Sequence, residues 1–263
     1  MKLNFFKYQG TGNDFIIIDN RKNEVGILNQ SQIEWLCNRK FGIGADGLML
    51  MNTKNGYDFE MVYFNADGKE SSMCGNGGRC MILFAYHQGI HEYTYRFTAI
   101  DGEHEGEIDI NNLIRLKMKN VDEIEFHNHH SILNTGSPHF VKQVHDLINV
   151  DVVETGRNIR ESKQFVKEGI NVNFVETISE DAIFVRTYER GVEDETLSCG
   201  TGVTAAALVS AHNNRGFNRV EVKTPGGNLS VEFEKINDSF FENIWLCGPA
   251  NFVFKGEIEV DTG

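Results

Sequence analysis

Cys74-Gly75-Asn76-Gly77 and Cys199-Gly200-Thr201-Gly202 are the two stretches of sequence that decide the fold. Each precedes a run with too few charges for a surface helix, Met81–Ala85 after the first and Thr204–Val209 after the second. A helix that is apolar on every side belongs in the interior of a protein. We therefore predict two buried helices, each beginning at a cysteine.

The N-terminus of a helix gives such a cysteine a specific chemical environment. Unpaired N–H groups and roughly half a positive charge lie there. They lower the pKa of a thiol from its free value of about 8.5 and can also hold a carboxylate. One such cysteine is ordinarily a buried, inert small hydrophobe, but two in matching local sequences indicate function. Gly89 and Gly216 mark the expected ends of the two helices.

The matching cysteines belong to an internal duplication with an offset of about 125 residues. Landmarks recur in one order, in the pairs Thr11 and Thr135, Gly42 and Gly169, Cys74 and Cys199, Thr98 and Thr224. The halves meet near residues 117–130, so we expect an N-terminal domain over 1–118 and a C-terminal domain over 119–250.

Local patterns predict a few further elements. Ile16–Asp19 is typical of a strand, and the alternation in Leu229–Phe233 predicts an antiparallel strand. A helix is expected over Ser31–Cys37, with Ser31 as N-cap and Glu34 completing a capping box.

Composition restricts the classes of function. A net charge of −13 over 263 residues argues against nucleic acid or an anionic membrane as partner. We expect no signal peptide and no membrane span, because no apolar run approaches about 18 residues. Five cysteines without a Cys-x-x-Cys pair suggest neither a disulfide framework nor a zinc site, which fits a reducing cytoplasm.

His127, His129 and His130 could bind metal, but an exposed turn is the expectation because no further ligand pattern completes a site.

Two similar domains that face each other would place two thiols on opposite faces of one bound molecule. One thiol could then remove a proton from a carbon while the other delivers a proton from the opposite face. The result is inversion of that stereocentre, and thiols at helix ends can reach pKa values near the working pH.

Motifs along nearly the full chain closely resemble those of the diaminopimelate epimerase family. They are Thr11–Phe15, Phe64–Gly68, Met73–Cys80, Gly136–His139, Glu189–Gly191 and Cys199–Gly202. The resemblance implies interconversion of LL- and meso-2,6-diaminopimelate without pyridoxal phosphate or metal, on the route to lysine and peptidoglycan. It also implies a cytoplasmic homodimer. The implied fold is α+β, with two pseudo-symmetric domains, each a mixed sheet around a central helix. The final strand, about 251–263, would return to the first domain.

The resemblance also implies roles for individual residues. Cys74 and Cys199 correspond to the two acid/base residues. The groups that hold the reacting carboxylate would be Gly75, Asn76, Gly200 and Thr201. The substrate-binding set would be Asn13, Asn65, Asn171, Glu189 and Arg190, with Arg190 clamping the distal carboxylate. His139 and Glu189 would tune the ionisation of the cysteines. From the residues alone, Glu189 could instead be an exposed turn residue and Asn171 a strand-end cap.

Two positions depart from the family pattern. Many relatives have Asn in place of Ser137, and some have Gln in place of Gly47. Proline racemase and hydroxyproline epimerase share the two-cysteine logic, but they usually carry His where this chain has Asn76. A phenazine-biosynthesis isomerase would share the fold without the thiol pair. A non-catalytic amino-acid-binding protein of this fold is the alternative from a different class.

Overall fold

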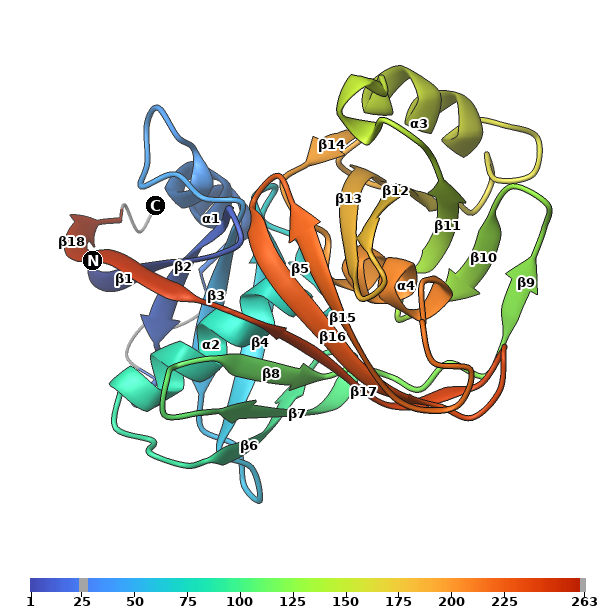
Figure 1. The fold of residues 1–263 in the computed structure, drawn as a ribbon. Helices are drawn as coiled ribbons and strands as arrows, with labels where there is room; N and C mark the ends of the chain where they lie inside the picture. The colour runs from blue at the N-terminus through green and yellow to red at the C-terminus, as the bar shows by residue number, and fades with distance from the viewer. Residues whose placement is uncertain (24–27, 261–263) are drawn as a thin grey trace. The chain divides into compact units, whose positions relative to one another are not determined.

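A computed structural model describes residues 1–23 and 28–260 of the chain (Figure 1). The contacts between residues divide it into two compact units. The first is Met1–Leu116 together with Pro249–Gly263, and the second is Lys117–Gly248. None of the helices in the described ranges is long and apolar enough to span a membrane.

Within residues 1–23 and 28–260, the first unit holds two helices and nine strands. These are β1 (Lys2–Gly10), β2 (Asn13–Asp19), α1 (Gln30–Cys37), β3 (Gly47–Asn52), β4 (Phe59–Asn65), β5 (Glu70–Ser71), α2 (Gly75–His87), β6 (Thr94–Ala99), β7 (Gly102–Ile108), β8 (Ile114–Lys117), whose last residue opens the second unit, and β18 (Asn251–Glu259).

The second unit repeats that order of elements. It comprises β9 (Ile124–Phe126), β10 (Ser131–Asn134), β11 (Pro138–Gln143), the 3-10 turn η1 (Leu147–Asn149), α3 (Val152–Arg160), β12 (Asn171–Ser179), β13 (Ala182–Glu189), β14 (Asp194–Thr196), α4 (Gly200–Val209), β15 (Gly216–Thr224), β16 (Gly227–Lys235) and β17 (Phe241–Gly248).

Strand pairing shows that the duplication is complete. In the first unit β2 runs parallel to β3 and β4 parallel to β6, and the neighbouring pairs are antiparallel. In the second unit β11 runs parallel to β12 and β13 parallel to β15, again among antiparallel pairs. Parallel neighbours need a crossover connection, and a helix supplies each one: α1 and α2 in the first unit, α3 and α4 in the second. The predicted α+β class with two pseudo-symmetric halves is confirmed.

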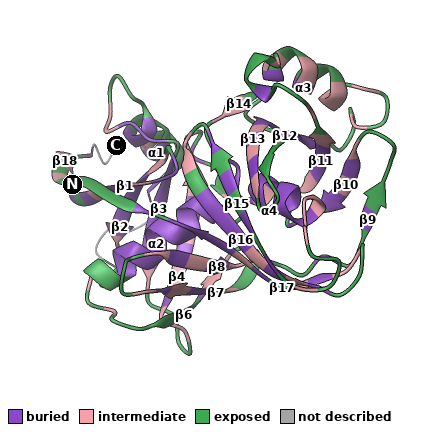
Figure 2. Cartoon of the chain, in the orientation of Figure 1, coloured by how far each residue is buried: buried purple, intermediate pink, exposed green. Residues whose placement is uncertain are grey.

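The helices that follow the two cysteines lie at the centres of the two units. α2 packs against β1, β2, β3, β7 and β18, and α4 packs against β10–β13 and β15–β17. Gly75–Ala85 are buried without interruption, as are all residues of Gly200–Leu208 except Thr201 (Figure 2). Each helix begins directly after its cysteine. The prediction of two buried helices is therefore confirmed.

Two local predictions were wrong. The N-cap of α1 lies two residues earlier than expected: it is Asn29, and Gln32 completes the capping box, in place of Ser31 and Glu34. α4 ends at Val209, well before Gly216, which instead opens β15 with a φ of +80°. The apolar run therefore set the length of α4. The predicted strands were confirmed as β2 and β16. The histidine cluster forms the expected turn, in which the His127 N–H donates to the His130 carbonyl; His127 and His129 are exposed and His130 is half-buried.

Candidate active site

Cys74 and Cys199 are the N-cap residues of α2 and α4. Helical hydrogen bonding starts with Gly78 N to the Cys74 carbonyl at 2.7 Å and Val203 N to the Cys199 carbonyl at 2.8 Å. Neither cysteine side chain caps its helix. By contrast, Asn29 and Asp151 each accept a bond from a first-turn N–H of α1 and α3. The cysteine side chains therefore leave the capping position of α2 and α4 to another acceptor, and an anion is a suitable one.

Asn13 connects the first cysteine to the sheet. Its Nδ2 donates to Asp46 Oδ2 at 2.6 Å, while its Oδ1 lies 3.6 Å from Cys74 Sγ and 3.4 Å from Asn76 Nδ2. The structure thus brings together three residues implied by the resemblance. Asp46 was not singled out from the sequence, and only the pairing of β2 with β3 brings it beside Asn13.

Arg79 is a second residue of this half to which the sequence assigned no role. It is fully buried in α2 and donates to Asn76 Oδ1 at 3.0 Å, Thr11 Oγ1 at 3.2 Å and the Gly75 carbonyl at 3.3 Å. Because Asn76 Oδ1 accepts from Arg79, its Nδ2 is directed to Asn13. An arginine inside an otherwise apolar helix was the available signal.

Asn171, at the start of β12, organises the polar residues of the second unit. Its Oδ1 accepts from Arg190 N at 2.9 Å, and its Nδ2 donates to Ser137 Oγ at 2.9 Å and to the Pro138 carbonyl at 3.2 Å. The Arg190 guanidinium, on an exposed residue, donates to Ser137 Oγ at 3.3 Å and to the Glu168 carbonyl at 2.9 Å. Ser137 therefore retains a polar function despite its departure from the family pattern.

Glu189 and Thr201 lie on either side of the second cysteine in sequence. Glu189 is half-buried at the end of β13 and accepts from Thr196 Oγ1 at 2.8 Å, so it is not an exposed turn residue. The Thr201 carbonyl accepts from Thr135 Oγ1 at 2.8 Å. The Oγ1 atom of Thr201 lies 3.5 Å from Cys199 Sγ. Thr135, which the duplication pairs with Thr11, therefore contacts the start of α4 directly.

His139 is buried in β11. Burial, with a smaller contribution from the nearby Arg190 cation, lowers the pKa of this imidazole to about 3. Its Nδ1 lies 3.0 Å from Asn173 Nδ2. His139 is therefore neutral at physiological pH. Asn173, adjacent to Val172 in a strand-like run, gave no sequence signal of function.

Asn65 and Gly47 pair across β4 and β3. The Asn65 side chain is exposed. A Cβ atom added to Gly47 would lie 2.5 Å from Tyr63 Cε2 and 2.6 Å from the Phe64 carbonyl oxygen. The ring of Tyr63 thus occupies the space that a side chain at position 47 would need.

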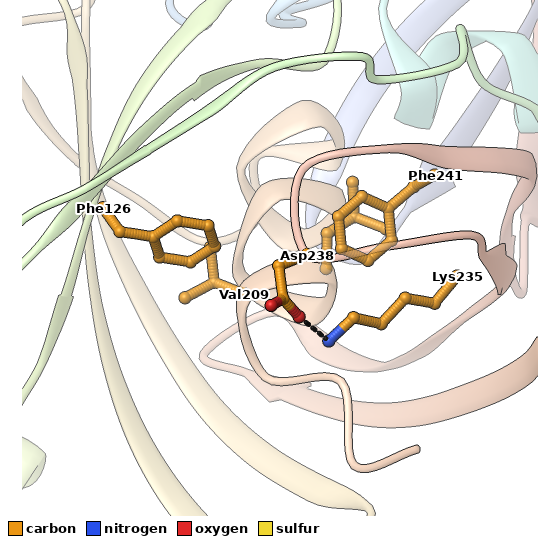
Figure 3. Close-up of a pocket in the computed structure, with 6 residues that line it drawn as sticks. Phe126, Val209, Lys235, Asp238 and Phe241 are labelled. Atoms are coloured by element: carbon orange, nitrogen blue, oxygen red, sulfur yellow. Dashed lines mark ion pairs between the residues drawn. The ribbon is translucent and has the colours of Figure 1, made fainter. Parts of the chain in front are cut away.

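The second unit also has a small surface pocket (Figure 3). It is lined at the C-terminal end of α4 by Leu208 and Val209, with Lys235 paired to Asp238 at 3.0 Å. A helix of ten residues is about 15 Å long, so this pocket is far from Cys199 and is not part of the candidate site.

Comparison with solved structures identifies the fold first. The chain shares its fold with a PhzF-family phenazine biosynthesis protein from Bacillus anthracis, with a TM-score of 0.75, 14% identity and coverage of 99% of this chain and 100% of that one. It also shares the fold with a probable proline racemase from Agrobacterium radiobacter K84, with a TM-score of 0.68, 13% identity and coverage of 98% and 93%.

Sequence comparison then identifies the family. The model of the diaminopimelate epimerase family matches residues 5–122 and 131–253. The chain is 50% identical to a diaminopimelate epimerase of Flavobacterium psychrophilum, over 98% of this chain and all of that protein. It is 43% identical to that of Chlorobaculum tepidum, over 95% and 98%. This chain belongs to the diaminopimelate epimerase family.

Proposed function

We propose that this protein epimerises LL-2,6-diaminopimelate to the meso isomer in lysine and peptidoglycan precursor biosynthesis. The observation that carries the proposal is the pair of cysteines at the N-caps of two buried helices, neither of which is capped by its cysteine side chain. Identity of 50% to a diaminopimelate epimerase over nearly the whole chain supports this substrate.

The chemistry that we propose is a two-base transfer. One of Cys74 and Cys199, as thiolate, takes the α-proton from one face of the carbon. The other, as thiol, delivers its own proton to the opposite face. The α-carboxylate is held by N–H groups of the first turns, at Gly75 and Asn76 and at Gly200 and Thr201. These groups also stabilise the charge that develops as the α-proton leaves.

The remaining residues would hold and orient the substrate. We assign binding of the substrate's polar groups to Asn13, Asn65, Asn171 and Glu189, and binding of the distal carboxylate to the Arg190 guanidinium. His139 and Glu189 would influence the ionisation of the thiols. The two compact units would act as two domains, each contributing one thiol.

The proposal includes a cytoplasmic homodimer that works without cofactor. β18, which pairs with β1, supports self-association through the apolar side chains on its surface. β18 also exposes Phe252, Val253 and Phe254 at 45%, 51% and 44%. A cluster of exposed apolar side chains commonly marks a surface that contacts another protein chain. Light scattering of the wild type and of Val253→Lys tests the assembly: a wild-type monomer would contradict it.

The function is tested with purified protein, LL-diaminopimelate and L-proline. We expect epimerisation of diaminopimelate alone, unchanged after exhaustive dialysis against EDTA and without the absorbance of a Schiff base. Racemisation of proline would reassign the substrate. Turnover of neither, despite binding of diaminopimelate, would indicate a non-catalytic binding protein. Loss of activity in EDTA with rescue by a divalent ion would overturn the cofactor-independent mechanism.

A further inference from the structure

Asn173 forms a polar cluster with His139 and Thr187 beneath the first turn of α4. All three side chains are buried. A Cβ atom added to Gly202 would lie 2.3 Å from Asn173 Oδ1, so the absent side chain at Gly202 lets the helix approach the asparagine amide closely.

The orientation of the Asn173 amide follows from its neighbours. Nδ2 lies 3.2 Å from the Phe140 carbonyl, which can only accept a hydrogen bond. A flipped amide would place two acceptor oxygens against each other. In the orientation that satisfies Phe140, Oδ1 accepts from Thr187 Oγ1 at 2.9 Å. Both ends of the amide are therefore fixed.

This orientation determines which nitrogen of His139 carries the proton. Asn173 Nδ2 has two hydrogens, and the second points to His139 Nδ1 at 3.0 Å. Nδ1 must therefore accept, and the proton of the neutral imidazole lies on Nε2. Protonation of Nδ1 would place two N–H donors against each other. Burial and, less strongly, the nearby Arg190 cation also disfavour a second proton on the His139 ring.

The Nε2–H group of His139 is buried, and it has no hydrogen-bond partner within residues 1–23 and 28–260. A buried unpaired donor is unfavourable, and an acceptor that arrives beside it gains a preorganised bond.

The first unit lacks this cluster. In the first unit, Phe15 pairs with Gly47 and Met49 pairs with Tyr63. At the equivalent positions of the second unit, His139 pairs with Asn171 and Asn173 pairs with Thr187. Phe15 and Met49 are the neighbours of Gly77 in α2. Apolar residues thus support the first helix where the polar cluster supports the second, so the cluster is not a requirement of the fold.

We propose that Asn173 is a positioning residue that locks His139 in the neutral Nε2–H tautomer, so that His139 serves the reaction as a hydrogen-bond donor and not as a base. The acceptor is an anion at the start of α4, either the sulfur of Cys199 or a carboxylate oxygen of the substrate. This inference rests on the proposed function for its role in turnover, whereas the tautomer is a property of the free protein.

The test is a ¹H–¹⁵N long-range correlation spectrum of protein labelled at histidine, with the His139 signals assigned by a His139→Gln variant. Between about pH 5 and 8, where free histidine titrates, we expect the Nε2–H pattern throughout. An Nδ1–H pattern, or a titration in that range, would overturn the proposal. Because the spectrum needs no substrate, it separates this inference from failure of the proposed function.

Asn173→Asp provides the perturbation. A carboxylate can only accept, so it should draw the proton of His139 to Nδ1 or make the ring titrate between about pH 5 and 8. We expect kcat to fall by roughly 10²-fold, the usual effect of losing one preorganised donor. The single variant Cys199→Ala distinguishes the two candidate acceptors. The change in the His139 Nε2 chemical shift on substrate binding should persist in this variant if a substrate oxygen is the acceptor, and it should be lost if the Cys199 sulfur is the acceptor.

Asn218→Asp is the matched control. Asn218 is fully buried in the same unit, and within residues 1–23 and 28–260 its amide bonds to the backbone of Asn213 and Gly216. We expect a comparable loss of thermal stability with unchanged His139 signals. Unchanged His139 ring-nitrogen signals in Asn173→Asp would contradict the proposal. If that variant does not fold, Thr187→Val removes the hydroxyl that fixes Oδ1 and should bring a second His139 form into the spectrum.

Discussion

Asn13 Nδ2 donates to Asp46 Oδ2 at 2.6 Å, and this bond determines which end of the Asn13 amide faces Cys74. A carboxylate only accepts, so the amide oxygen is left facing the thiol, which donates to it. A hydrogen bond from a thiol favours its protonated form. Asp46 is itself held by Arg39 at 2.7 Å.

Asp46→Asn should release this orientation. The Asn13 amide can then turn its N–H toward the sulfur, so alkylation of Cys74 by iodoacetamide at neutral pH should accelerate. We expect kcat/KM to fall about 10- to 100-fold, since a charge-assisted bond contributes about 1.5–3 kcal/mol. Asp67→Asn is the control, because Asp67 is an exposed carboxylate paired with Lys69. An unchanged alkylation rate in Asp46→Asn would contradict the assignment.

Gly47 and Tyr63 should be energetically coupled. Gly47→Gln alone forces a side chain into the ring of Tyr63 and should destabilise the protein by about 1–3 kcal/mol. Adding Tyr63→Thr, which imitates the Thr187 counterpart, should recover part of that loss. Urea unfolding of the two single variants and the double variant gives the coupling energy, and strictly additive effects would show that the ring does not fill this space.

Asp14 makes a pH-dependent contribution to stability. Burial would raise its pKa, but hydrogen bonds from Arg39 and Lys7 outweigh burial and lower it to about 2. A carboxyl group with a depressed folded-state pKa stabilises the protein above its unfolded value of 3.8, and this is lost as pH falls through about 2. The shift corresponds to about 2 kcal/mol. Compared with Asp14→Asn, the wild type should lose its advantage in chemical unfolding between about pH 4 and 2; a constant difference would refute the shift.

Arg190→Ala should mainly weaken substrate capture. Loss of a guanidinium bound to a carboxylate costs about 1.5–3 kcal/mol, or roughly 10- to 100-fold in KM. Arg190→Lys should restore little of the substrate binding, because lysine lacks the planar guanidinium that binds a carboxylate in a bidentate manner. Arg219→Ala is the control, since its partners are Glu221 and Glu232, which lie outside the proposed substrate-binding set. Unchanged catalytic efficiency in Arg190→Ala would show that another group clamps the substrate.

Cys74→Ala and Cys199→Ala test the two-base mechanism. Each should abolish inversion, while the remaining thiol still exchanges the α-hydrogen of the isomer that it faces. Proton NMR in deuterated water should therefore show opposite preferences of the two variants for the LL and meso isomers. In the wild type, early product should carry deuterium at the inverted carbon while unreacted substrate does not. Near wild-type epimerisation in either variant would disprove the assignment.

The sequence by itself determined the features that depend on near neighbours and on spacing. The starts of α2 and α4 at Cys74 and Cys199 follow from glycine-rich turns before apolar runs, and a helix without a polar face must be buried. Recurrence at one offset determined the duplication, because two similar sequences satisfy the same packing constraints. Choice among adjacent caps was less certain: Asn29, Ser31 and their partners differ little in intrinsic preference.

Tertiary structure alone decided which distant polar groups meet. Asn13 is 33 residues from Asp46, and Asn173 is 34 from His139. Parallel pairing of β2 with β3 and of β11 with β12 brings each pair into one cluster. A hydrogen bond requires donor and acceptor within about 3 Å, and no local pattern encodes such an approach across a crossover connection. The amide orientations at Asn13 and Asn173 therefore depend on the register of the sheets, which the packing of α2 and α4 against them sets.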